Sequence, residues 1–284
     1  MSLRVITTTR CQLSCTYCHR EGWTEESCDK DIILDDLLSA CKKVGETYDS
    51  EITLSGGEPL LHSNFDTILQ RLSRQGFSVT LLTNGHLLHE HLGVLSYLQS
   101  IHVSLPSLDS AYYSRTTGSE MHGVINNIDL LRTQYPDLLL KINCVIDETC
   151  LKINNFFSEM IHFSTAVNAT LKLIRKFDVG SRSSFDDGDL LPSLYRLGYT
   201  SQYSDGRTSL FRHRTSCPLE LTEITCSVAQ KYSNPCNTCQ RWSDKYIGVD
   251  GEIFNCPWSS NFDNFEQITR QSKFSYEEHT VTLD

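Results

Sequence analysis

Short runs of β-branched and apolar residues alternate with helix-like patterns along the first part of the chain. Six such runs are typical of strands and lie at residues 3–8, 51–54, 77–82, 101–104, 138–145 and 170–174. Apolar residues recur at intervals of three and four, as on one face of a helix, at residues 32–44, 65–73, 124–132 and 150–163. The pattern predicts an α/β fold in which strands and helices alternate.

The connections between these strands are long enough only for crossovers, so we expect parallel strands joined in the right-handed sense. Six units predict a partial (β/α)6 TIM-like barrel over residues 1–178. Beyond about residue 178 the alternation gives way to sequence rich in Ser, Asp and Gly and then in Cys. We therefore expect residues 179–284 to form a small C-terminal auxiliary domain.

Unusual motifs follow the predicted strands where the strands end. A cysteine-rich stretch follows the first strand, Gly56-Gly57-Glu58-Pro59 the second, Thr83-Asn84-Gly85 the third and residues 104–109 the fourth, and Asn143 lies within the fifth. Glycine and asparagine are ordinary turn residues. However, the carboxyl ends of barrel strands share one face, where such folds place their chemistry. The motifs therefore predict one functional site on that face.

The cysteine-rich stretch TTRCQLSCTYCHREG contains Cys11, Cys15 and Cys18 in a C-x3-C-x2-C spacing. Three thiolates on one loop can bind three irons of a cubane 4Fe-4S cluster, which leaves the fourth iron open for another ligand. A structural zinc site would instead need two close pairs of Cys or His ligands. Only His19 follows, too near to complete a tetrahedron comfortably.

Composition narrows the class of protein. The chain has 284 residues and 12 cysteines, and its formal net charge of -10 repels nucleic acid and anionic membranes. No signal peptide or membrane-length apolar stretch is evident. We therefore expect a cytoplasmic protein, without nucleic-acid or membrane partners, whose cysteines serve metal binding or catalysis.

One basic run, at residues 206–214, departs from the acidic average. A solvated charged loop is the favoured interpretation. The alternative is a clamp for a carboxylate or phosphate of a small substrate.

In the cysteine spacing, the GGEP motif and the residues at the strand ends, the chain resembles the radical S-adenosylmethionine (SAM) superfamily. The resemblance implies that Cys11, Cys15 and Cys18 hold a 4Fe-4S cluster whose open iron binds SAM. An electron donor such as flavodoxin or ferredoxin would reduce the cluster, and SAM would yield a 5′-deoxyadenosyl radical. That radical would abstract hydrogen from a small metabolite or a short peptide, leading to cyclisation, dehydrogenation or epimerisation.

The same resemblance assigns the SAM contacts. Gly56, Gly57, Glu58 and Pro59 correspond to the motif that holds the amino group, and Glu58 is suited to accept hydrogen bonds from an ammonium. Tyr17 corresponds to the aromatic residue beside the adenine. Ser104 corresponds to a ribose contact, and Asn143 to a polar residue near the sugar or carboxylate. For Ser104 and Asn143 an ordinary turn or capping role is the alternative.

The stretches TRCQLSCTYC and VSLPSLDSAYYSRTTG look like the GTP 3′,8-cyclase family of molybdenum-cofactor synthesis, over roughly the first 175 residues. The chain has Pro106 where that family usually has Asp, and residues 280–284 lack its paired terminal glycines. A nucleotide cyclase is therefore kept as an alternative. A non-catalytic iron-sulfur or zinc protein is a further alternative.

A second group of cysteines lies late in the sequence, at Cys217, Cys226, Cys236, Cys239 and Cys256. Cys236 and Cys239 form a chelating pair, and Cys256 follows a predicted hairpin turn at residues 249–252. The group resembles the Twitch and SPASM extensions, which implies one auxiliary 4Fe-4S cluster on Cys236, Cys239 and Cys256, with Cys217 as the candidate fourth ligand; zinc is the alternative. With three protein ligands the free iron could bind substrate, whereas with four the cluster would relay electrons.

Five thiols exceed the four that a cubane uses, so Cys217 or Cys226 is spare. Some members of the family use a lone cysteine as hydrogen donor, and Cys226 is our candidate; a buried packing role is the alternative. Four scattered cysteines are interpreted as packing residues, namely Cys28, Cys41, Cys144 and Cys150.

Overall fold

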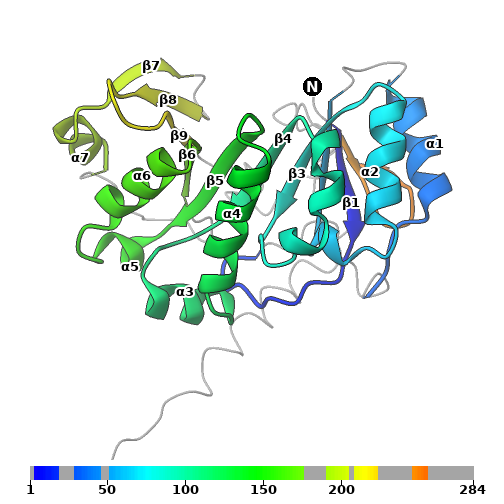
Figure 1. Ribbon diagram of the computed structural model, residues 1–284, viewed down its shortest axis with the longest axis horizontal. Coiled ribbons are helices and arrows are strands. Elements are labelled where there is room, and N and C mark those ends of the chain that lie inside the picture. Colours follow the sequence, from blue (N-terminus) through cyan, green and yellow to red (C-terminus); the bar gives the residue numbers. More distant parts are fainter. Residues whose placement is uncertain are drawn as a thin grey trace, which may run out of the picture.

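The computed structural model describes residues 3–18, 29–45, 51–175, 190–204, 208–222 and 245–254. Six parallel strands in chain order form the centre of its sheet, as predicted. They are β1 (Leu3–Thr8), β2 (Glu51–Gly56), β3 (Ser78–Thr83), β4 (Ser100–Ser104), β5 (Leu139–Ile146) and β6 (Thr170–Arg175). With the crossover helices outside, they make the expected partial barrel (Figure 1).

Four longer helices pack along the outer face of this curved sheet, namely α1 (Leu34–Gly45), α2 (Phe65–Arg74), α4 (His122–Gln134) and α6 (Phe156–Ala166). The two faces differ because side chains alternate along a strand. In β5, Ile142 and Cys144 are fully buried beneath the helices, whereas Lys141 and Asn143 are only partly buried on the inner face. The apolar core therefore lies between sheet and helices, and the inner face is polar.

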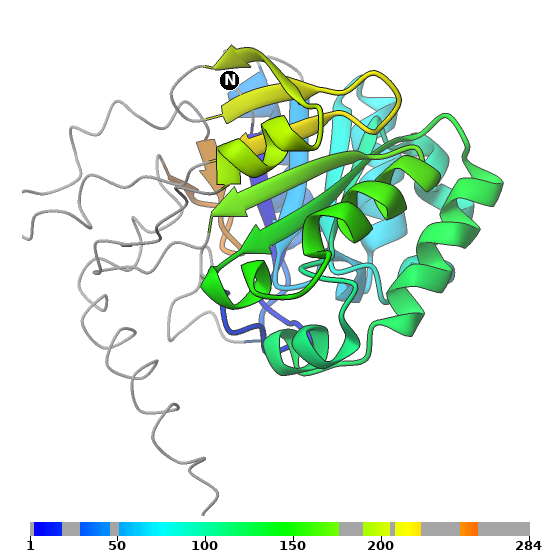
Figure 2. The same ribbon diagram turned by 90° about the vertical axis from the view of Figure 1, so that its left-hand side faces the viewer.

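Short helical segments fill the connections. They are α3 (Ser110–Thr117), α5 (Glu148–Leu151) and the 3-10 helices η2 (Pro59–Leu61), η3 (Leu88–Glu90) and η4 (Leu92–Tyr97). Figure 2 shows the arrowheads of β5 and β6 at one edge of the sheet, and α5 follows β5 there. Since all six strands are parallel, this carboxyl edge is also where the loops after β1 to β4 emerge.

The described residues after 178 extend the same sheet at both sides. On the β6 side lie β9 (Leu219–Thr222), β8 (Thr208–Arg212) and β7 (Thr200–Ser204), with α7 (Leu190–Arg196) before them. On the β1 side lie β10 (Lys245–Ile247), parallel to β1, and β11 (Ile253–Phe254). Residues on both sides of position 178 thus share one sheet, and the division into 1–178 and 179–284 stays a prediction.

Every predicted strand and three of the four predicted helices agree with the structure to within two residues at each end. The single helix predicted at residues 150–163 is wrong. It is divided into α5 and α6 because Asn155 takes a left-handed conformation with φ 61°, which interrupts the helical path.

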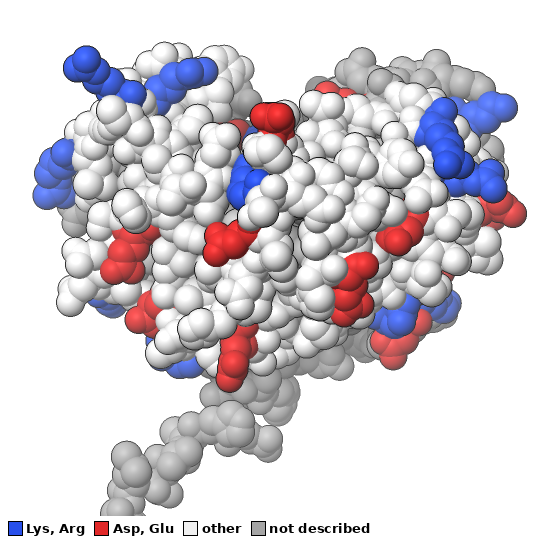
Figure 3. All heavy atoms as spheres, in the orientation of Figure 1, with Lys and Arg blue, Asp and Glu red and all other residues white. Residues whose placement is uncertain are grey.

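The described part of the basic run includes a strand, so the interpretation as a solvated loop is wrong for residues 208–212. Residues 208–212 form β8, and Phe211 within it is 2% exposed. The alternation that buries Phe211 leaves Arg212 exposed. Figure 3 shows Lys and Arg side chains at the upper left, over the region of β7 and β8, with acidic side chains spread across the rest of that face.

Arg132 joins the connections at the opposite, amino edge of the sheet. Its guanidinium donates to the carbonyls of Val167 and Leu138 at 2.6 Å each and of Asn168 at 2.8 Å. One side chain on α4 thus fixes the chain just before β5 and just before β6. Within the described residues, no helix has both the length and the apolar character needed to cross a bilayer.

Candidate functional site

The carboxyl edge brings together the motifs that the sequence places after separate strands. The cysteine loop follows β1, the Gly56–Pro59 turn follows β2, and Asn84 and Ser104 lie at the ends of β3 and β4. Hydrogen bonds link these segments directly to one another. The following contacts show how each one is held.

The cysteine loop rests on the last turn of α3. The Ser14 N–H donates to the Thr117 carbonyl at 3.1 Å, and the Thr16 N–H donates to the Thr116 carbonyl at 2.8 Å. The last carbonyls of a helix have no partner within the helix, so they are free to accept such bonds. Gly118 ends α3 in a left-handed conformation with φ 77°. Neither α3 nor this contact is predicted from the sequence.

Arg10 ties the start of the loop to two other segments. Its guanidinium pairs with both carboxylate oxygens of Asp31, at 3.1 and 2.6 Å, and donates to the Leu61 carbonyl at 2.7 Å. The pKa of Asp31 lies below its ordinary value, because hydrogen bonds from Thr8 and Arg10 outweigh the opposing effect of partial burial. Arg10 and Asp31 are site residues that the motif analysis missed, since their pairing depends on the fold.

The three thiols of the loop differ in exposure. Cys11 and Cys15 are partly buried, Cys18 is exposed, and none forms a disulfide. Burial, with a smaller contribution from neighbouring thiols, raises the pKa of Cys11 and takes that of Cys15 to about 12. Neutral thiols are therefore favoured here, and thiolates require a compensating cation.

That donor set fits a cluster better than a single ion. Within the described ranges, no three His, Cys, Asp or Glu side chains converge closely enough to hold one metal ion. In a cubane each thiolate binds a different iron, so the three sulfurs need not converge on one point. The three thiols of one loop supply the ligands that such a cluster needs.

The two glycines of the Gly56–Pro59 turn pack against the backbone of β1 and its loop. A β-carbon at Gly56 would lie 2.3 Å from the Thr8 carbonyl oxygen, and one at Gly57 would lie 2.2 Å from the Arg10 carbonyl oxygen. The Glu58 N–H donates to that same Arg10 oxygen at 2.7 Å. Any side chain at these positions would separate the turn from the cysteine loop. Contact of the glycines with SAM stays a prediction.

Glu58 is completely buried. Its Oε1 accepts from the Leu60 N–H at 3.2 Å and the Thr83 hydroxyl at 2.7 Å, and its Oε2 accepts from the Asn84 N–H at 2.7 Å. Burial raises its pKa to about 7, although these hydrogen bonds favour the ionised form. Glu58 thus joins the turn after β2 to the end of β3, and Pro59 begins η2. Its predicted contact with an ammonium stays a prediction.

Ser104 and Asn143 are neighbours on the inner face. They face each other across β4 and β5, and the same row continues to Lys172 on β6 and Glu220 on β9. The buried Oδ1 of Asn143 has no hydrogen-bond partner among the described residues. A buried acceptor of this kind needs a donor, and a ligand hydroxyl or amine would satisfy it.

Tyr17 points beneath the cysteine loop. Its hydroxyl donates to Cys15, and Tyr113 and Cys144 lie close to it. The Tyr113 hydroxyl in turn contacts His86 Nε2 at 3.1 Å. Tyr17 therefore supports the loop from within, and its predicted place beside an adenine stays a prediction.

Cys217 lies apart from this group. It is 5% exposed and precedes β9 beside the start of β6, at the amino edge of the sheet. Its N–H donates to Thr165 Oγ1 at 2.9 Å, and its thiol lies 3.8 Å from the Ile161 carbonyl oxygen. Cys226, Cys236, Cys239 and Cys256 lie outside the described residues, so their predicted cluster stays a prediction. Cys41, Cys144 and Cys150 are buried, which confirms their packing role, and Cys28 also lies outside the described residues.

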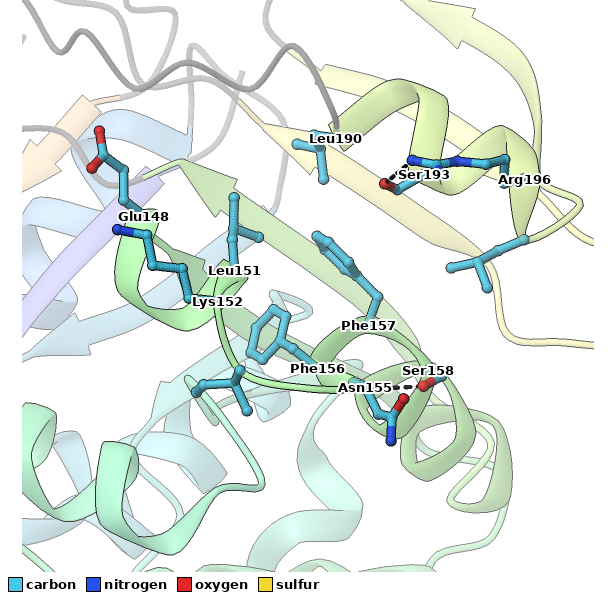
Figure 4. Close-up of a pocket in the computed structure, with 12 residues that line it drawn as sticks. Glu148, Leu151, Lys152, Asn155, Phe156, Phe157, Ser158, Leu190, Ser193 and Arg196 are labelled. Atoms are coloured by element: carbon cyan, nitrogen blue, oxygen red, sulfur yellow. Dashed lines mark hydrogen bonds between the residues drawn. The ribbon is translucent and has the colours of Figure 1, made fainter.

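A groove of about 670 Å³ lies beside the end of β5, between α5, the first turn of α6 and α7. Figure 4 shows Leu151, Phe157 and Leu190 in its middle, Glu148 and Lys152 at one end, and Arg196 at the other. Its volume lies within the range of small-molecule sites. None of the predicted cofactor residues lines it.

Comparison with known proteins matches the sequence pattern of the Radical SAM superfamily to residues 5–149, just over half of the chain. A probable GTP 3′,8-cyclase of Methanococcus vannielii is 30% identical, over 87% of this chain and 82% of the relative. A probable GTP 3′,8-cyclase of Sulfolobus acidocaldarius is 27% identical, over 96% of this chain and 86% of the relative.

Among solved structures, Streptococcus suis SuiB bound to the precursor peptide SuiA is similar in fold. The TM-score is 0.66 at 14% identity, and the match covers 90% of this chain and 60% of SuiB. At that identity the likeness concerns the fold alone.

Proposed function

Because the chain belongs to the radical SAM superfamily, we propose that its carboxyl edge binds SAM on a 4Fe-4S cluster and directs hydrogen abstraction from a small metabolite or a short peptide. The observation that carries this proposal is the direct bonding of the cysteine loop to the Gly56–Pro59 turn, through the Arg10 carbonyl and the Glu58 N–H at 2.7 Å. The thiols and the turn are thereby held as one unit.

When bound, the cluster supplies the electron that cleaves SAM to methionine and a 5′-deoxyadenosyl radical. The protein's part is to bind and orient the cofactor. Glu58 holds the turn and the end of β3 in place. The unpartnered Oδ1 of Asn143 is available to accept a hydrogen bond from a SAM hydroxyl or amine.

The inner face supports a substrate that carries an anionic group. Lys141, Lys172 and Arg4 surround His102 closely enough to lower its pKa further, beyond the effect of burial. Glu220 pairs with Lys141 at 2.6 Å. These three cations lie near His102 in a chain whose formal net charge is -10. A carboxylate or phosphate on the substrate would be attracted to this face.

Nucleotide cyclisation is the second candidate. The relatives named as GTP 3′,8-cyclases cover most of this chain, and a cationic inner face suits a phosphorylated substrate. Pro106 is the departure in the described residues: it is buried, and its carbonyl accepts from the Cys144 thiol at 3.3 Å. A metabolite or peptide carboxylate would be attracted to the same cations.

An auxiliary 4Fe-4S cluster on Cys236, Cys239 and Cys256 is proposed as well. Cys217 is buried beside α6, which favours Cys226 over Cys217 for a role near this cluster. Cys226 would then be either the fourth ligand or the hydrogen donor. Iron and acid-labile sulfide analysis tests whether the second cluster is present, with about four irons per chain for one cubane and about eight for two.

Anaerobic reconstitution followed by product analysis tests the proposal. We expect 5′-deoxyadenosine from SAM and reductant, and its yield should rise with the true substrate in a screen that includes GTP, carboxylate metabolites and short peptides. Deuterium transfer from the substrate would identify the carbon attacked. Cys11→Ala, Cys15→Ala and Cys18→Ala should each abolish the product, whereas the packing variant Cys41→Ala should retain it. Undiminished turnover in a loop variant would overturn the proposal.

A further inference from the structure

Asn84 lies between the cysteine loop and the Gly56–Pro59 turn. It follows β3 directly and is 9% exposed. Its side-chain Nδ2 lies 3.9 Å from Cys11 Sγ, within hydrogen-bonding distance for sulfur. The Leu13 N–H donates to the same sulfur at 3.5 Å. Cys11 therefore receives one backbone and one side-chain donor.

The orientation of the Asn84 amide follows from its other contacts. Its Oδ1 lies 3.1 Å from the His86 N–H and 3.2 Å from Gln12 Nε2. Amide oxygen and nitrogen are hard to tell apart by shape alone, but a backbone N–H can only donate. The atom facing His86 must therefore be the oxygen, which leaves the NH2 group facing Cys11.

Two further contacts fix the backbone of this residue. The Asn84 N–H donates to Glu58 Oε2 at 2.7 Å. Asn127 on α4 donates to the Gly85 and His86 carbonyls, at 2.9 and 2.8 Å. Little freedom remains for the amide to turn away from the sulfur, and its burial strengthens the hydrogen bond electrostatically.

From this geometry we infer that Asn84 tunes the reduction potential of the first cluster by donating a hydrogen bond to the Cys11 thiolate. Hydrogen bonds to cluster sulfurs are one determinant of iron-sulfur potentials. Reduction adds one electron and hence negative charge to the cluster and its thiolates, so a donor at the sulfur stabilises the reduced state. Asn84 thereby makes the cluster easier to reduce. The inference rests on the proposed function, since it requires the cluster.

The test is a redox titration of the reconstituted full-length protein without SAM, with dithionite as electron source and EPR of the reduced cluster as readout. Asn84→Leu removes the donor and leaves the backbone N–H to Glu58. We expect the equilibrium constant for one-electron reduction to fall about threefold to tenfold, where tenfold corresponds to about 59 mV. Asn84→Asp should lower it further, because a carboxylate repels the thiolate.

Asn127→Leu is the matched control, since it loosens the same loop without touching the sulfur. An unchanged potential in Asn84→Leu, or an equal shift in Asn127→Leu, would overturn the inference. If Asn84→Leu assembles no cluster, the smaller Asn84→Ser and the Asp variant decide by the same measurement. A wild-type protein that holds no iron-sulfur cluster would refute the proposed function itself, whereas wild-type SAM cleavage with unshifted variants refutes only the role of Asn84.

Discussion

Gly118 lies so close to Ser14 that a β-carbon at position 118 would come within 2.6 Å of Ser14 Oγ. The two residues join the end of α3 to the cysteine loop, where the loop amides bond to the carbonyls of Thr116 and Thr117. The position of the three thiols that are predicted to bind the cluster thus depends on a helix about a hundred residues later in the chain.

Gly118→Ala should reduce the iron content of the reconstituted protein, because the new methyl group displaces Ser14. The left-handed backbone adds about 1–2 kcal/mol of strain for a residue with a β-carbon. Gly76→Ala is the control: its φ is also positive, at 86°, but its β-carbon meets nothing within 4 Å. We expect Gly76→Ala to lose stability and keep its iron. Equal iron in both variants would contradict the prediction, and Ser14→Gly combined with Gly118→Ala should restore iron.

Glu58→Gln should weaken SAM binding, measured by calorimetry under anaerobic conditions. The neutral amide cannot accept hydrogen bonds at both atoms, so a donor from Thr83, Leu60 or Asn84 loses its acceptor. A hydrogen bond to a charged group contributes about 1.5–3 kcal/mol, so affinity should fall about tenfold to a hundredfold. The exposed Glu90→Gln serves as control.

The same variant separates two roles of Glu58. If the carboxylate contacts the SAM ammonium, binding of 5′-methylthioadenosine, which lacks that group, should be unaffected. If the carboxylate only holds the turn, both ligands should bind more weakly. Unaltered SAM affinity would exclude both roles.

His102 should make the protein sensitive to acid. Burial lowers its pKa to about 3, and the cations Lys141, Lys172 and Arg4 on the facing strands act in the same direction. The unfolded chain takes up a proton at this residue near pH 6.5 while the folded chain does not, so stability is lost as the pH falls below 6.5. The loss is on the order of 3 kcal/mol at pH 4.

Urea unfolding at a series of pH values measures this dependence. Between pH 6.5 and 4, His102→Gln should lose less stability than the wild type by about the same 3 kcal/mol, whereas His89→Gln, at an exposed position, should follow the wild type. Equal slopes in wild type and His102→Gln would show that other groups cause the acid sensitivity.

Arg132→Met should lower the free energy of unfolding by about 2–5 kcal/mol, because it removes donors from several carbonyls at once. Urea denaturation of the variant measures the loss. Arg74→Met, at the exposed end of α2, should change stability by less than about 0.5 kcal/mol. Comparable losses in both would indicate a general effect of charge removal instead.

The sequence predicts the barrel strands well because each has a local apolar period, and the first four are each followed by a motif. It also predicts the edge where the cysteine loop, Glu58 and Asn143 lie. Contacts between distant segments could not be predicted in this way. The pairing of Arg10 with Asp31 and the support of the loop by Thr116 depend on which strands and helices are neighbours, and no local pattern encodes that.

Some features that the prediction misses do have a signal in the sequence. Asn154-Asn155 stands where the predicted helix breaks, and asparagine is among the residues that most readily adopt the left-handed conformation. β8 contains the apolar residues Leu210 and Phe211 among basic ones. The charge of the run favours the loop interpretation, although these two residues indicate a strand. The sequence marks Thr83-Asn84-Gly85 only as a strand end, although Asn84 contacts Cys11 in the structure.

The pairing of β1 with β10 has a consequence for synthesis of the protein on the ribosome. Val5 lies opposite Ile247, so the earliest strand acquires one of its two partners only after some 240 further residues have been made. Contacts so far apart in sequence form slowly, and unpaired strand edges promote aggregation. Until β10 has been synthesised, the nascent chain therefore carries an open edge beside the segment that contains Cys11, Cys15 and Cys18.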